Sequence, residues 1–209
     1  MGKWAVAALS FVLLLAGPGW TVQNNAEDVQ PASLRQFSIS TAHKVIARWP
    51  EASRKAAVHV LDKYGAPDLL TNEMLIWMEE GEWQEIIVRK RAVEHRFPVP
   101  HDDVLEQSIA YEVPEDKFDD LAVFNGSVIA ERTRGTLSSR CASEAMNYLA
   151  LNLANDIITN SKSVEEARAA FADILKELME GRPHPYTTGL KFRVYGIKET
   201  SDPDYSIYG

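Results

Sequence analysis

The sequence has one cysteine, Cys141, in 209 residues. A single thiol excludes a disulfide within one chain, so the fold must depend on its hydrophobic core. Basic residues are also scarce: 22 Lys and Arg stand against 30 Asp and Glu, which gives a net charge of −8. Nucleic acids and anionic membranes both recruit basic surfaces, so this balance argues against either as a partner.

Long apolar runs are absent after the first twenty residues. The one early run, Trp4 to Ala16, follows Lys3 and precedes Gly17-Pro18-Gly19. This pattern is typical of a secretory signal peptide, and the run is too short to cross a membrane. We expect residues 1–19 to be the signal peptide, with cleavage after Gly19 or, at the latest, after Ala26. The mature chain is then exported, soluble and without a transmembrane span, in the periplasm or outside the cell.

Several catalytic motifs are missing as well. The sequence contains no Gly-rich phosphate loop, no Ser-x-x-Lys and no Gly-x-Ser-x-Gly. Because 45% of the residues are hydrophobic, the chain can nevertheless build a substantial core. The first hypothesis is therefore a non-enzymatic binding or envelope-accessory protein with an envelope protein as its partner, and no cofactor is predicted.

The spacing of apolar residues predicts an order of elements. After a flexible lead-in at residues 20–38, helices are expected at 41–48 and from Pro50 to a C-cap at Gly65. Strands are expected at 74–78, 83–90, 108–113 and 127–134, with a loop at 96–107 and a short acidic helix from Pro114 to about Val123. Two long helices follow, one from about Cys141 to Thr159 and one after the capping box of Ser163 and Glu166.

The end of the sequence is expected to form a last strand at 190–195 and a flexible tail at 196–209. Helices and strands are mixed without strict alternation, which indicates an α+β fold with a mainly antiparallel sheet. Two N-terminal helices and two long C-terminal helices should pack on that sheet. We expect one composite domain at residues 39–195, with a sub-boundary near Pro114 as the alternative.

One segment carries a family resemblance. The letters "KYGAPD" followed by "LIW" supply Gly65, Pro67, Asp68 and Trp77. In this respect residues 41–113 resemble the helix-helix-three-strand module of the SmpA/OmlA (BamE-like) envelope proteins. The resemblance implies a protein-binding role in a bacterial envelope. This chain has no lipidation cysteine, and the residues after Val113 have no counterpart in that module.

Cys141 supports a second hypothesis, a cysteine-dependent hydrolase or transferase. If Ser138 or Ser139 caps the following helix, the thiol lies in its first turn, where the helix dipole favours the thiolate. A nucleophile also needs a base, and His101 and His184 are the candidates because both lie in Pro-flanked loops. A buried structural cysteine and a disulfide-linked dimer through Cys141 remain open.

Metal binding is the third hypothesis. Potential ligands crowd the segment "EHRFPVPHDDVLE", namely His95, His101, Asp102, Asp103 and Glu106. Imidazole and carboxylate groups of this kind bind zinc, although the spacing matches no established motif. The acidic segment "EVPEDKFDD" offers oxygen ligands for calcium, but a solvated helix start accounts for these acids equally well.

Overall fold

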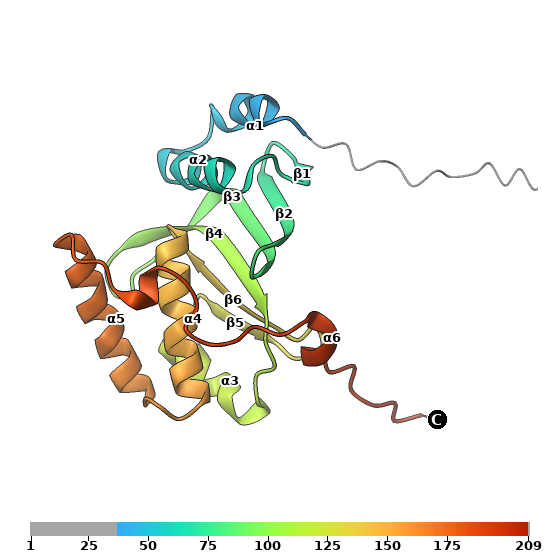
Figure 1. Cartoon of the computed structure of the whole chain (residues 1–209), viewed down its shortest axis with the longest axis vertical. Coiled ribbons are helices and arrows are strands. Elements are labelled where there is room, and N and C mark those ends of the chain that lie inside the picture. Colours follow the sequence, from blue (N-terminus) through green and yellow to red (C-terminus); the bar gives the residue numbers. More distant parts are fainter. Residues whose placement is uncertain (1–36, 209) are drawn as a thin grey trace, which may run out of the picture. The chain divides into compact units, whose positions relative to one another are not determined.

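A computed structural model describes residues 37–208, which belong to one compact unit. The predicted signal peptide, and the predicted lead-in up to residue 36, lie outside the described residues. The described chain has the predicted α+β fold with an antiparallel sheet, which has six strands rather than the five expected (Figure 1). No helix within residues 37–208 has the length and apolar character needed to cross a membrane.

The sheet has the strand order β1-β2-β3-β4-β6-β5, and neighbouring strands are antiparallel. Its strands are β1 (Leu69–Leu70), β2 (Met74–Glu80), β3 (Trp83–His95), β4 (His101–Ala110), β5 (Val128–Glu131) and β6 (Thr136–Cys141). The helices are α1 (Ile39–Ile46), α2 (Glu51–Tyr64), α3 (Phe118–Phe124), α4 (Glu144–Ile158), α5 (Val164–Met179) and α6 (Ile197–Thr200), with short 3-10 turns η1 (Glu115–Lys117) and η2 (Pro185–Thr187).

Helix α4 is the centre of the fold, as its paired apolar residues predict. It packs on β4, β5 and β6 and contacts α5 and α3 on its other sides, while α2 packs on β3 and β4 (Figure 1). Nearly all of its residues are buried, including Leu149 and Leu153. The predicted end of α2 is also confirmed: Gly65 is its C-cap with φ of +82°, a conformation that glycine adopts without strain.

The segment before α4 is a strand, so the prediction that a helix begins near Cys141 was wrong. Residues Thr136–Cys141 form β6, whose two neighbours are β4 and β5. Alternation along the strand puts Leu137, Ser139 and Cys141 on one face. Because α4 starts only at Glu144, Cys141 lies outside its first turn, and the expected dipole effect on the thiol does not apply.

Two further predictions need correction. The predicted loop at 96–107 is short, because its prolines, Pro98 and Pro100, both precede β4, which begins at His101. Residues 190–195 do not form a strand. Their backbone is instead bound to α4, where Asn152 Oδ1 accepts a hydrogen bond from Lys191 N at 2.7 Å.

A buried carboxylate fixes the start of α4 against α2 and the sheet. Glu144 is 5% exposed and accepts four hydrogen bonds, from Lys63 Nζ (2.5 Å), Tyr64 OH (2.5 Å), Trp83 Nε1 (3.0 Å) and Gln107 Nε2 (3.0 Å). We call these five residues the Glu144 cluster. Burial acts to raise the pKa of Glu144, but the hydrogen bonds from Lys63, Tyr64 and Gln107 outweigh it and lower the pKa.

Helix α6 is fastened to the turn before β6. Thr200 is buried and donates a hydrogen bond from Oγ1 to Gly135 O at 2.8 Å. Gly135 has φ of +68°, and a Cβ there would collide with the backbone of Thr200 and Ser201. The turn thus needs glycine both for its conformation and for this close approach.

We therefore expect Gly135→Ala to lower the free energy of unfolding by about 2 kcal/mol or more, from left-handed strain plus the collision. Chemical denaturation followed by circular dichroism measures the change. Gly126→Ala is the matched control, because Gly126 has no positive φ and a Cβ there meets no atom within 4 Å. Equal effects of the two substitutions would contradict this role of Gly135.

Candidate metal centre

One end of the sheet gathers histidine, aspartate and cysteine side chains. His95 ends β3, His101 begins β4, and the two residues are directly paired across the strands. Asp103 lies two residues along β4, so strand alternation places it on the same face as His101. Cys141 ends the neighbouring strand β6 and is paired with Leu105 of β4, on that same face. We call His95, His101 and Asp103 the His-Asp cluster.

The loop between β3 and β4 is anchored to α5, which fixes the two histidines. Phe97 packs against Phe171 in a tilted arrangement, with ring centroids 5.4 Å apart, and the Arg168 guanidinium lies 3.8 Å from the centre of the Phe97 ring. Arg168 also donates a hydrogen bond to Phe124 O at 2.5 Å, at the end of α3. The sequence therefore folds locally into a hairpin whose tip is clamped by an aromatic pair and a cation–π contact.

The donor atoms of the His-Asp cluster converge. One ligand atom from each residue lies within 4.8 Å of the other two. His101 Nε2 lies 3.1 Å from Asp103 Oδ1, and His95 Nδ1 lies 3.4 Å from Asp103 Oδ2. The two imidazole rings have centroids 4.9 Å apart. This arrangement offers two nitrogen donors and one carboxylate to a single point.

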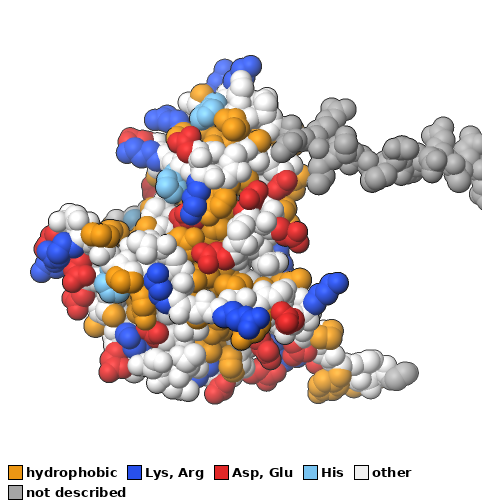
Figure 2. All heavy atoms as spheres, viewed as in Figure 1, with side chains coloured by type: hydrophobic (Ala, Val, Ile, Leu, Met, Phe, Trp, Pro, Cys, Tyr) orange, Lys and Arg blue, Asp and Glu red, His pale blue; other side chains and the backbone are white. Residues whose placement is uncertain are grey.

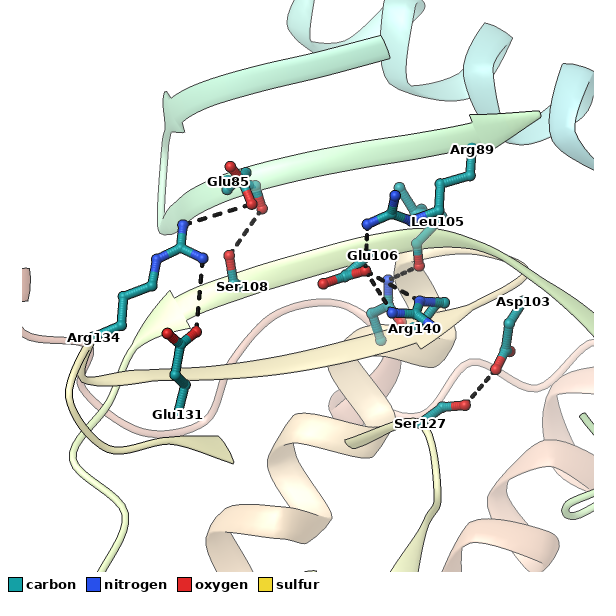
Figure 3. A network of polar contacts seen from close by, with 11 residues as sticks. Glu85, Arg89, Asp103, Leu105, Glu106, Ser108, Ser127, Glu131, Arg134 and Arg140 are labelled. Carbon is teal, nitrogen blue, oxygen red and sulfur yellow. Dashed lines mark hydrogen bonds and ion pairs between the residues drawn. The ribbon is translucent and has the colours of Figure 1, made fainter. Parts of the chain in front are cut away.

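Neighbouring groups orient the ligands. His101 Nδ1 lies 2.8 Å from the backbone oxygen of Val99, so a proton on Nδ1 leaves Nε2 free to accept or to ligate. Ser127, just before β5, donates a hydrogen bond to Asp103 Oδ2 (Figure 3). Metal-binding histidines and carboxylates typically have outer partners of this kind, because such partners fix the tautomer and the ring orientation.

Two atoms of the cluster are buried without a hydrogen bond. Asp103 is fully buried, yet its Oδ1 has no hydrogen-bond partner within the described chain, and the same holds for His95 Nδ1. The 3.1 Å approach of His101 Nε2 to Oδ1 therefore lacks hydrogen-bond geometry. Burying a polar atom without a partner costs about 1–3 kcal/mol, so each such atom requires an explanation. A protonated His101 gives Oδ1 an ion-pair partner at 3.1 Å, and a metal ion in place of that proton would satisfy both atoms.

The two histidines have opposite pKa shifts. The Asp103 carboxylate, followed by the Cys141 sulfur, raises the pKa of His101 to about 11. Burial, followed by the nearby His101, lowers the pKa of His95 against the attraction of Asp103. His95 thus favours the neutral form that ligates metal, whereas His101 would exchange its proton for a metal ion.

The structure separates the other predicted ligands from this centre. Asp102 is exposed, as alternation along β4 requires. Glu106 also lies on the face opposite to Asp103, where it accepts hydrogen bonds from Arg89 and Arg140 (Figure 3). Within residues 37–208 the His-Asp cluster is the sole group of three or more potential metal ligands, so the acidic segment 112–120 forms no such group.

Of the two predicted bases, the structure places His101 beside Cys141. Cys141 Sγ lies 3.4 Å from His101 Nε2, and the thiol is 6% exposed. His184 instead precedes η2, where its Nδ1 accepts a hydrogen bond from Tyr186 N. Because Cys141 is buried, a disulfide between two copies of the chain would require this end of the sheet to open.

Sequence reasoning missed Ser127 and the convergence of Cys141 with the predicted metal ligands. Ser127 follows Asn125-Gly126 and looks like an ordinary turn residue, so no local signal identifies it. The link to Cys141 depends on the antiparallel pairing of β4 with β6, whose paired residues are 26 to 36 positions apart in the sequence. Comparisons with protein-family models, with curated proteins and with solved structures find no match to this chain.

Proposed function

We propose that this protein binds a transition-metal ion, with zinc as the preferred metal, through His95, His101 and Asp103. The observation that carries the proposal is the convergence of three donor atoms in a site where two of the donors are buried without a hydrogen bond. Acidic and basic side chains are interspersed on the face drawn in Figure 2, which gives no support to a nucleic-acid partner.

The donor set favours zinc over calcium. Calcium takes six to eight oxygen ligands, whereas two imidazoles and a carboxylate are a common zinc set. At the usual zinc bond lengths, a nitrogen and an oxygen ligand lie about 3.4 Å apart in a tetrahedral site. The distance of 3.1 Å from His101 Nε2 to Asp103 Oδ1 is close to that spacing, while His95 Nδ1 lies 3.4 Å from the other carboxylate oxygen, Oδ2.

The test is a zinc titration of the chain purified without a histidine tag, followed by calorimetry and by metal analysis after gel filtration. We expect one zinc per chain and a loss of binding in Asp103→Asn, which keeps the shape of the side chain but removes its charge. His43→Ala is the matched control, since His43 is exposed on α1. Sub-stoichiometric zinc in the parent protein, or equal losses in both variants, would contradict the proposal.

A second candidate function is thiol chemistry at Cys141, favoured by the 3.4 Å contact with His101 Nε2. Burial opposes it, because a nucleophile must be reached by its substrate. We expect native protein to react with iodoacetamide slowly at every pH between 6 and 8, and denatured protein to react at the rate of a free thiol. Intact-mass spectrometry measures the extent of labelling. Rapid labelling of the native protein near pH 6 would favour the enzyme instead.

Export is part of the proposal, supported by the signal-like pattern of residues 1–19. In an oxidising compartment a lone thiol is open to unwanted disulfide exchange, and burial beside a metal site would protect it. Sequencing the N-terminus of protein recovered from an expressing bacterium tests export; an intact Met1 would count against it. An envelope protein partner, implied by the resemblance of residues 41–113 to the SmpA/OmlA module, stays a prediction.

A further inference from the structure

We infer that Cys141 is the fourth ligand of the metal, so that the complete site is one cysteine, two histidines and one aspartate. The fourth-ligand role depends on the proposed metal binding at His95, His101 and Asp103. It adds a thiolate to that set and closes the coordination sphere.

Distance supports this assignment. Cys141 Sγ lies 3.4 Å from His101 Nε2, and a sulfur and a nitrogen ligand of one tetrahedral zinc lie about 3.6 Å apart. The sulfur is not one of the atoms that lie within 4.8 Å of one another, so metal binding must draw it toward Asp103 and His95. We expect this to occur by rotation of the Cys141 side chain at the end of β6.

Cys141 belongs to the buried core, but its sulfur also has polar neighbours. Its close neighbour is the imidazole nitrogen that faces Asp103, rather than an aliphatic side chain alone. The fully buried Asp103 adds an oxygen without a hydrogen-bond partner to the same place. A thiol packed only for its volume would require neither of these polar neighbours.

Four protein ligands have a functional consequence. A catalytic zinc keeps a position open for water or substrate, whereas a site with four protein ligands is closed. The metal would then join β6 to the β3–β4 hairpin and stabilise that end of the sheet. Thiolate and imidazole ligands also favour zinc or cobalt over magnesium, calcium or manganese.

Cobalt(II) is the probe that tests the inference, because a thiolate ligand gives an intense charge-transfer band in the near ultraviolet and tetrahedral geometry gives strong visible bands. The full chain is titrated with cobalt alone under reducing conditions. We expect both sets of bands at one equivalent, and their bleaching when zinc is added. In Cys141→Ser we expect the charge-transfer band to vanish and cobalt affinity to fall roughly a hundredfold.

Ser138→Ala, on the opposite face of β6, is the matched control and should keep the full spectrum. Circular dichroism of Cys141→Ser tests whether the variant is folded. If it is not, the cobalt spectrum of the parent protein still shows whether a thiolate binds the metal. Cobalt bound by the parent protein without the thiolate band would overturn the fourth-ligand role and leave the His-Asp site standing. No cobalt binding at all would overturn both.

Discussion

His101→Ala should weaken zinc binding by roughly a hundredfold. Structural zinc sites contribute about 10–16 kcal/mol, and one ligand of three or four carries about 3 kcal/mol or more of that, where 1.4 kcal/mol is a factor of ten. His101 holds a central place in the site, because its Nε2 faces both Asp103 Oδ1 and Cys141 Sγ. Competition with a chromophoric chelator measures the affinity.

His184→Ala is the control for this experiment. His184 was predicted as an alternative functional histidine, but it caps η2 and makes its contacts with Tyr186. Its removal should leave zinc affinity unchanged. A loss of affinity of the same size in both variants would show that the ion is bound elsewhere or without specificity.

Glu144→Ala should lower the free energy of unfolding by about 3–5 kcal/mol, the usual loss when one partner of a buried ion pair is removed. Gln107 is a fully buried donor that would lose its acceptor, and Trp83 would keep only the Tyr64 hydroxyl, while the half-exposed Lys63 can turn to water. Urea unfolding measures the loss. Glu144→Gln is the control, because its amide oxygen keeps an acceptor, and it should cost clearly less.

The Glu144 cluster also predicts an acid limit of stability. A carboxyl whose pKa is lower in the folded protein than in the unfolded chain stabilises the fold above its unfolded pKa. This contribution decreases as pH falls below about 4.5 and is lost once pH has passed the folded pKa. Unfolding between pH 7 and pH 3 should therefore show a steeper loss of stability in the parent protein than in Glu144→Gln. Parallel curves would contradict the assignment.

Helices were easier to predict than strands, for physical reasons. Nearby residues determine the apolar stripe of α2, the end of α2 at Gly65 and the capping box of α5. The structure confirms all three features. Strand β6 was wrongly predicted to lead into a helix, because its sequence "TLSSRC" has few apolar residues and so no clear strand pattern. It is a strand because β4 and β5 flank it, and such long-range pairing has no local signature.

The site was partly predictable. His95, His101 and Asp103 stood out because potential ligands crowd one short segment. The prediction of a loop at residues 96–107 was the obstacle, because only in a strand do Asp102 and Asp103 point to opposite faces. Once β4 begins at His101, the period of two residues selects Asp103 and turns Asp102 outward. The approach of Cys141 could not be predicted, because it depends on the register of β4 against β6.

Anomalous X-ray scattering at the zinc edge, from crystals of the full chain grown with one equivalent of zinc, tests the central claim most directly. We expect one strong peak at the end of β3 and β4, about 2.0–2.2 Å from a nitrogen of His95, from His101 Nε2 and from an Asp103 oxygen. A peak bound by other residues, or no peak within reach of Asp103, would contradict the account.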